Sequence, residues 1–285
     1  MKIGVSGASG HLGKTIVSEL LRRAAGHEVI AISRTPETVA GPAQGRLGNY
    51  DQPDGLAKAY ADLDRLLIIP TVDPVPGKRG TQNIAAIDAA VKAGVKHIVF
   101  MSGVGTRQEE EPALGAPYWR GEQHLIATAP VWTILRMNAY AEAFAQQAQT
   151  SQERGVLTGL AENRVGFVSR SDVAAAAAGI LIGDGHTGAI YNATGPERVS
   201  GAQRAALVTE ITGRPLAFVV ITEDQLRTGL AQAGLPPGAL SAVIGIQKNF
   251  AAGAFDILTG DVERLGGRPP KSLRDVLAEV IGSVA

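Results

Sequence analysis

The 285-residue sequence contains no cysteine and carries no formal net charge. The absence of cysteine excludes disulfide bridges, thiolate metal sites and cysteine nucleophiles. The 27 basic side chains equal the 27 acidic ones in number, so no long-range field draws the chain to nucleic acid or to an anionic membrane. The five histidines show no HExxH-like spacing. We therefore expect neither a metal cofactor nor a nucleic-acid partner.

The sequence also lacks a long apolar run. No stretch reaches the ~18 apolar residues that a membrane span needs, and the N-terminus becomes glycine-rich before a signal region could form. Hydrophobic residues nevertheless make up 45% of the chain, which favours a globular core over disorder. These features predict a soluble, cytoplasmic protein that spans no membrane.

The first 150 residues alternate short apolar runs with amphipathic segments. This alternation is typical of an α/β protein with a doubly wound parallel sheet. The expected strands are Ile3–Ser6, Val29–Ser33, Leu66–Ile69, His97–Met101 and Trp132–Leu135, and the expected helices are Lys14–Arg23, Gly55–Ala61, Gln82–Ala93 and Tyr118–Thr128. The alternation weakens after residue 150, without a linker or a repeat. We predict one domain over residues 1–150 and a smaller α/β C-terminal cap over residues 151–285 that shares its core.

Three glycines follow the first expected strand and open the first expected helix. Gly7 permits a tight turn, Gly10 lets backbone N–H groups approach a pyrophosphate, and Gly13 allows the helix to pack closely on the strand. The N-terminus of the helix adds partial positive charge. A glycine-rich turn without a ligand is the alternative. The sequence therefore predicts a dinucleotide site that contains Gly7, Ser9, Gly10, His11, Leu12 and Gly13.

The second expected strand ends at Ser33 and is followed by Arg34. Dinucleotide-binding domains that prefer NAD place an acidic residue near this point. A carboxylate would repel a 2′-phosphate, whereas an arginine forms charge-assisted hydrogen bonds with it. Arg34 therefore favours NADPH, with NADH as the alternative cofactor. A solvated surface arginine is the structural alternative.

Longer stretches of the sequence resemble the NmrA-like branch of the atypical short-chain dehydrogenases. They are VSGASGHLG, GNYDQP, AGVKHIVFMS, WTILRMNAYAE, FVSRSDVAAAAAGIL and YNATGPE, and together they extend over nearly the whole chain. Within that branch the sequence is similar to type-2 NAD(P)H:quinone oxidoreductases and triphenylmethane reductases. The resemblance implies a Rossmann domain and a C-terminal portion that binds substrate and returns segments to the sheet. It also implies direct hydride transfer, without a flavin, from NAD(P)H to a quinone or similar planar acceptor.

The same resemblance implies roles for residues outside the glycine loop. Contact with the cofactor is implied for Arg34, Ile69, Pro70, Thr71 and Ser102. Contact with the acceptor is implied for Tyr118, Met137, Asn138 and Tyr140. Ser102 and Tyr118 are the candidate catalytic residues. The structural alternatives are a strand end for Ser102 and a half-buried tyrosine for Tyr118. Asn138 is expected to cap a helix, and contact with the acceptor would add to that role.

Tyr118 departs from the ordinary short-chain dehydrogenase pattern, in which a lysine four residues later lowers the pKa of the tyrosine. Here the later residue is Glu122, and a carboxylate raises the pKa of a neighbouring tyrosine. Alcohol or ketone chemistry is therefore not expected. A quinone is a stronger acceptor, and its reduction depends mainly on positioning. Glu122 itself is expected to be a solvated or ion-paired helix residue.

Two other functions fit the same residues. An NmrA-type redox sensor would bind the dinucleotide without turnover. A tailoring oxidoreductase would couple reduction of a quinone to hydroxylation of an aromatic polyketide. The apolar segment around Val243 is a candidate face for a homodimer.

Overall fold

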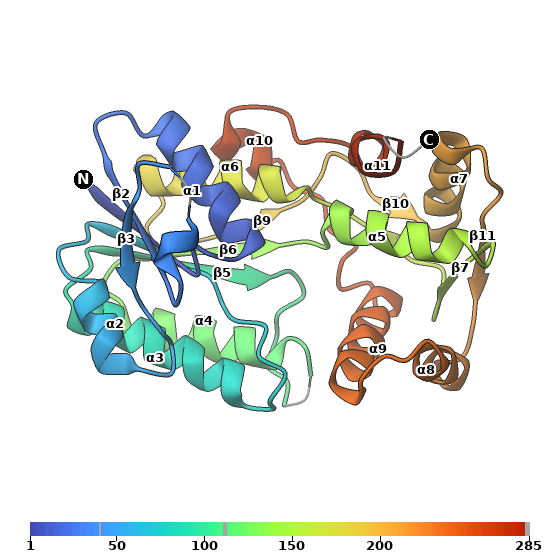
Figure 1. Ribbon diagram of the computed structural model, residues 1–285, viewed down its shortest axis with the longest axis horizontal. Coiled ribbons are helices and arrows are strands. Elements are labelled where there is room, and N and C mark those ends of the chain that lie inside the picture. Colours follow the sequence, from blue (N-terminus) through green and yellow to red (C-terminus); the bar gives the residue numbers. More distant parts are fainter. Residues whose placement is uncertain (40, 111–112, 283–285) are drawn as a thin grey trace.

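The computed structural model describes residues 1–39, 41–110 and 113–282, and its main element is a seven-stranded sheet (Figure 1). The strand order is β3-β2-β1-β4-β5-β6-β9, and neighbouring strands all run parallel. The strands are β1 (Lys2–Ser6), β2 (Glu28–Ser33), β3 (Gln44–Leu47), β4 (Arg65–Ile68), β5 (His97–Gly103), β6 (Trp132–Met137) and β9 (Ala189–Ala193). The direction of winding reverses between β1 and β4, where such sheets open a crevice for a ligand. The predicted doubly wound fold is confirmed.

Helices cover both faces of this sheet (Figure 1). One face carries α1 (His11–Arg23) and α6 (Arg170–Ile182). The other carries α2 (Pro53–Ala59), α3 (Lys78–Lys92) and α4 (Ala116–Thr128). Gly94 has a φ of +72° just after α3, as expected of a glycine that ends a helix.

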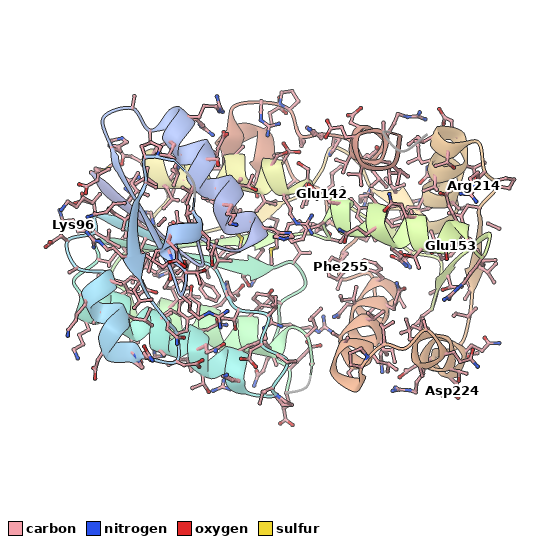
Figure 2. All side chains as sticks on the ribbon, viewed as in Figure 1. Lys96, Glu142, Glu153, Arg214, Asp224 and Phe255 are labelled. Carbon is pink, nitrogen blue, oxygen red and sulfur yellow. The ribbon has the colours of Figure 1, made fainter. Side chains whose placement is uncertain are left out.

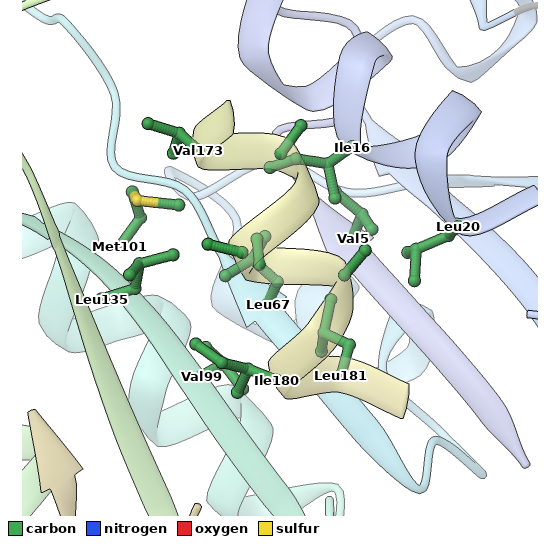
Figure 3. Packing of buried hydrophobic residues seen from close by; sticks show 14 of the residues in the cluster. Val5, Ile16, Leu20, Leu67, Val99, Met101, Leu135, Val173, Ile180 and Leu181 are labelled. Carbon is green, nitrogen blue, oxygen red and sulfur yellow. The ribbon is translucent and has the colours of Figure 1, made fainter. Parts of the chain in front are cut away.

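The core on the α6 side is built from alternate residues of the central strands. Val5, Leu67 and Val99 pack against Ile180 and Leu181 of α6 (Figure 3). The intervening strand residues belong to a second core beneath α2, α3 and α4, which includes Ile30, Leu66, Ile68, Ile98 and Phe100. Because both faces are buried, the strands read as continuous apolar runs rather than as alternating patterns.

Helix α6 is buried along most of its length, because five consecutive alanines, residues 174–178, let its neighbours approach closely. Gly179 marks the closest approach, since a Cβ there would lie 1.9 Å from the carbonyl oxygen of Leu265 in α10 (Asp261–Gly266). Together with β9, α6 returns residues beyond 150 to the larger sheet, and the two halves share one core.

The remaining C-terminal elements form a smaller α/β unit around a third core (Figure 1). Strands β8 (Arg164–Val165) and β10 (Val199–Ser200) pair antiparallel, whereas β7 (Val156–Gly159) and β11 (Ala217–Val220) pair parallel. The helices are α5 (Ala141–Gln152), α7 (Gly201–Thr212), α8 (Glu223–Gln232), α9 (Pro237–Ala251) and α11 (Leu273–Ile281). Ser200 and Thr222 cap α7 and α8 through capping boxes. The homodimer face around Val243 in α9 stays a prediction.

His97 at the start of β5 predicts an acid-sensitive fold. Its Nε2 lies 2.8 Å from the Oγ1 of Thr133 on β6. Burial, with the positive charge of Arg65 and the neighbouring His186, lowers the pKa of His97 from 6.5 to about 4. Between these two values the unfolded chain binds more protons than the folded one, so the free energy of unfolding falls as the pH falls.

We expect His97→Gln to flatten this part of the stability profile, because glutamine does not titrate. Urea denaturation of both proteins at several pH values across that window checks the expectation. Parallel profiles for the two proteins would contradict it.

Candidate functional site

The predicted nucleotide loop lies between β1 and α1, at the carboxyl edge of the sheet. Gly7 has a φ of +93°, in the left-handed region that favours glycine. The backbone N–H groups of Gly7 and Ala8 both donate to the carbonyl oxygen of Ile32 in β2, at 2.9 and 3.1 Å. A Cβ on Gly13 would lie 2.2 Å from the carbonyl oxygen of Gly7. The loop therefore folds back on α1 as tightly as the spacing of the glycines predicts.

The first turn of α1 has no cap from a side chain. Gly10 precedes the helix, and the first turn contains no acidic residue. The first N–H groups of a helix have no partner inside it, so those of His11 and Leu12 are free to bind an anion. Ser9 and Gly10 lie beside them on the exposed side of the loop. This geometry fits a pyrophosphate.

Arg34 follows β2 at the same edge of the sheet. Its side chain is exposed and has no ion pair or hydrogen bond with any described residue. Ser33 is buried, and its hydroxyl oxygen accepts the backbone N–H of Thr35 at 3.1 Å. Arg34 is therefore a cation without a partner among the described residues, one strand away from the glycine loop.

Residues Ile69–Thr71 follow β4, on the other side of the reversal in strand order. The carbonyl oxygen of Ile69 accepts the hydroxyl of Tyr50 at 2.9 Å. Burial raises the pKa of Tyr50, so this phenol stays protonated and holds the segment. Thr71 donates its hydroxyl to the side-chain oxygen of Gln82 in α3. The segment is thus fixed at both ends, with Pro70 half-buried between them.

Ser102 near the end of β5 belongs to a buried charged network. Its hydroxyl donates to Oε1 of Glu122 at 2.6 Å. Glu122 in α4 is 1% exposed and accepts the Nε and Nη2 of Arg136 at 2.8 and 2.5 Å. Ser102 and Arg136 are direct neighbours in the pairing of β5 with β6. Glu122 is ion-paired, one of its two predicted states, and the cofactor contact and catalytic role of Ser102 stay predictions.

Tyr118 lies half-buried in the first turn of α4. A Cβ on Gly103, the last residue of β5, would lie 3.7 Å from its ring. The guanidinium carbon of Arg79 in α3 lies 5.0 Å from the centroid of the same ring. Glu122 directs its oxygens to Arg136 and Ser102 rather than to Tyr118, so its charge is balanced within the network.

Tyr140 lies after β6, between a thioether and a guanidinium. Its hydroxyl donates to Sδ of Met137 at 2.7 Å, and the guanidinium carbon of Arg170 lies 4.9 Å from its ring centroid. Burial, and then the nearby Tyr118, raise the pKa of Tyr140, so the phenol is neutral at ordinary pH. The structure thus brings Tyr118, Met137 and Tyr140 to one end of the sheet.

Asn138 does not cap a helix, because α5 begins only at Ala141. Its side chain is 2% exposed and donates from Nδ2 to the carbonyl oxygen of Phe255 at 3.2 Å. Figure 2 shows Phe255 and Glu142 at the junction between the sheet and the C-terminal unit. Asn138 therefore ties the end of β6 to the segment after α9, and its contact with an acceptor stays a prediction.

Two features of this edge are not visible in the sequence. The burial of Glu122 depends on Arg136, which is 14 residues away and reaches it only through the strand register. Arg79 approaches Tyr118 only because α3 and α4 lie side by side (Figure 1).

The described part of the chain contains no group of three or more His, Cys, Asp or Glu side chains that could hold a metal ion. Nor does it contain a helix that is long and apolar enough to cross a membrane.

Comparison with known proteins extends this description. A family model described as NAD(P)H-binding matches residues 7–183, which is more than half of the chain. Quinone oxidoreductase 2 of Escherichia coli is 28% identical over 98% of this chain and 98% of its own length. A (4-alkanoyl-5-oxo-2,5-dihydrofuran-3-yl)methyl phosphate reductase of Streptomyces griseus is 30% identical over 96% of each chain.

Solved structures of similar proteins share the fold of this chain over nearly its whole length. The Citrobacter sp. triphenylmethane reductase complexed with NADP(H) has a TM-score of 0.89 at 26% identity, and covers 98% of this chain and 100% of its own. The Escherichia coli quinone oxidoreductase 2 complexed with NADPH has a TM-score of 0.90 at 26% identity, and covers 97% of this chain and 99% of its own. The chain therefore belongs to the NAD(P)H-binding family and is an NAD(P)H-dependent oxidoreductase.

Proposed function

We propose that the protein is an NADPH-dependent reductase that passes hydride directly to a quinone or a similar planar conjugated acceptor. The observation that carries this proposal is the uncapped glycine loop, with the unpaired Arg34 one strand away. Full-length similarity to a quinone oxidoreductase and to a triphenylmethane reductase supports the choice of acceptor.

In this proposal the glycine loop and Arg34 bind two different phosphate groups of the cofactor. Backbone N–H groups of the loop and of the first turn of α1 donate to the pyrophosphate. Arg34 pairs with the 2′-phosphate, which NADH lacks. When bound, NADPH supplies a hydride, and a proton from water completes the reduction of a quinone to a hydroquinone.

The remaining residues position the acceptor and exclude water. Tyr118, Met137 and Tyr140 provide flat or polarisable surfaces that suit a conjugated ring. The network of Ser102, Glu122 and Arg136 joins α4 to the ends of β5 and β6 and so supports the floor of the proposed site. Asn138 joins the end of β6 to the backbone of Phe255. We therefore propose residues 151–285 as the substrate-binding portion.

Arg34 provides the first test of this arrangement. Arg34→Gln should raise the Kd for NADPH about 10-fold to 100-fold, because it removes charge-assisted hydrogen bonds to a phosphate. The Kd for NADH should change little, which makes NADH the internal control. Fluorescence titration of both cofactors checks this expectation. An equal loss for both cofactors would contradict the assignment of Arg34 to the 2′-phosphate.

Turnover separates a reductase from a sensor. Flavin-free protein is mixed with NADPH and a series of neutral quinones, and the loss of NADPH absorbance is followed. We expect quinone-dependent oxidation that is faster with NADPH than with NADH. If NADPH binds and no quinone is reduced, the redox-sensor function is favoured instead. Analysis of the product for added oxygen distinguishes simple reduction from a tailoring reaction.

A further inference from the structure

Arg79 is a cation for which the described residues offer no acceptor. It is the second residue of α3 and is half-buried, with its guanidinium carbon 5.0 Å from the ring centroid of Tyr118. Its Nε is buried without a hydrogen-bond partner. Buried polar groups in native proteins are almost always satisfied, so an unpaired arginine in this position indicates a missing anionic or polar partner.

Three other cations at the same edge of the sheet, unlike Arg79, have an ion-pair partner. Each of them has a carboxylate within 4 Å: Arg136 with Glu122, Arg170 with Glu142, and Lys78 with Asp51 and Asp73. Arg79 differs from these three cations, because the described residues leave its charge uncompensated.

Arg120 in α4 adds a second cation that has no ion pair with a described residue. Its guanidinium lies over the backbone of Gly80 in α3, where a Cβ would come within 2.8 Å of Nη1. The first turns of α3 and α4 contain no acidic residue, although a carboxylate oxygen of Glu109 lies close to Gly115, just before α4. Arg79 and Arg120 thus place two cations without a described ion-pair partner where α3 packs against the start of α4.

Asn83 supplies a simpler explanation for part of this pattern. It lies one helical turn after Arg79, is fully buried, and has an unpartnered Oδ1. A single water between Oδ1 of Asn83 and Nε of Arg79 would satisfy both atoms. The guanidinium carries four further N–H donors on its terminal nitrogens, and a water at Nε leaves them without a protein acceptor.

We propose that Arg79, with Arg120, forms an anion subsite beside the proposed acceptor site. The acceptor then carries a negatively charged substituent, such as a sulfonate, carboxylate or phosphate, beside the conjugated ring that lies against Tyr118. A planar guanidinium recognises such groups through paired hydrogen bonds. This inference rests on the proposed function, because it names the class of acceptor for the same site.

Matched acceptors test the subsite. The kcat/KM is measured for 1,4-naphthoquinone-2-sulfonate and for neutral 2-methyl-1,4-naphthoquinone, in wild type, Arg79→Gln and Arg79→Lys. We expect Arg79→Gln to lower kcat/KM for the sulfonate about tenfold more than for the neutral quinone, with partial recovery in Arg79→Lys. Added salt should raise KM for the sulfonate only. Arg214→Gln, an exposed site at the far end of the C-terminal unit (Figure 2), should leave the ratio unchanged.

A binding measurement separates failure of the subsite from failure of the proposed function. Calorimetric titration of the NADP⁺-loaded protein with naphthalene-2-sulfonate, which is not reduced, reports the subsite without turnover. Weaker binding by Arg79→Gln supports the subsite even if neither quinone is reduced. Equal binding, or an equal fall in kcat/KM for both quinones, overturns it. If the NADPH Kd rises in Arg79→Gln and the selectivity between quinones stays the same, Arg79 belongs to the cofactor site instead.

Discussion

Replacing Gly13 by alanine is expected to raise the Kd for NADPH about 5-fold to 150-fold. The new Cβ would lie 2.2 Å from the carbonyl oxygen of Gly7 and 2.8 Å from the Cα of Ala8. Both neighbours are backbone atoms, so the loop itself must move. Overpacking of a tight site costs about 1–3 kcal/mol when the structure resists it. Fluorescence titration with NADPH measures the loss.

Gly10 and Gly229 provide controls that separate binding from folding. A Cβ on Gly10 meets only the carbonyl oxygen of Gly7, at 3.4 Å, so Gly10→Ala should fold normally. It should nevertheless bind NADPH more weakly than wild type does. A Cβ on Gly229 in α8 has nothing within 4 Å, so Gly229→Ala should bind NADPH as wild type does. It should also gain about 0.5–1 kcal/mol of helix stability. Normal NADPH binding by Gly13→Ala would contradict the assigned loop.

Replacing Glu122 by alanine is expected to lower the free energy of unfolding by about 3–5 kcal/mol. The change leaves Arg136, whose side chain is 21% exposed, without its carboxylate, and leaves the buried Ser102 hydroxyl without its acceptor. An uncompensated charge at this depth costs far more than the loss of a surface ion pair, which is worth about 0–1 kcal/mol. Urea denaturation measures the difference.

A double-mutant cycle shows whether this loss comes from the network. Glu122→Leu combined with Arg136→Met replaces both charges by apolar groups, and it should recover much of the stability lost in either single variant. A loss below about 1 kcal/mol in Glu122→Ala would mean that the pair behaves like an exposed one. Strict additivity of the two single changes would show that Glu122 and Arg136 act independently.

The central fold is readable in the sequence because each element carries its own signal. The buried strands are continuous apolar runs, Gly94 ends α3 in the left-handed region, and Ser200 and Thr222 cap their helices. β3 carries little such signal, since its sequence QGRL is mostly exposed at the edge of the sheet. β9 pairs with β6, which lies about 50 residues earlier in the chain, and this pairing is set by tertiary packing rather than by a local signal.

The site is only partly readable, because several of its contacts depend on strand register. The glycine loop is local, and its geometry follows from three residues in one turn. Glu122 and Arg136 meet only when α4 has packed over the paired ends of β5 and β6. Asn138 reads as a helix cap in sequence, but α5 starts later and the side chain binds the backbone of Phe255 instead. Such contacts leave no periodic pattern in the sequence, so the sequence does not predict them.

Single turnover with deuterated cofactor tests the central claim most directly. Flavin-free protein is loaded with NADPH that carries deuterium on one or the other face of the nicotinamide C4, and is mixed with a quinone. Direct transfer predicts that deuterium on one face slows NADPH oxidation, that deuterium on the other face does not, and that no flavin spectrum appears. NADPH that binds and is not oxidised by any quinone, or oxidation that occurs only after a flavin is added, would contradict the account.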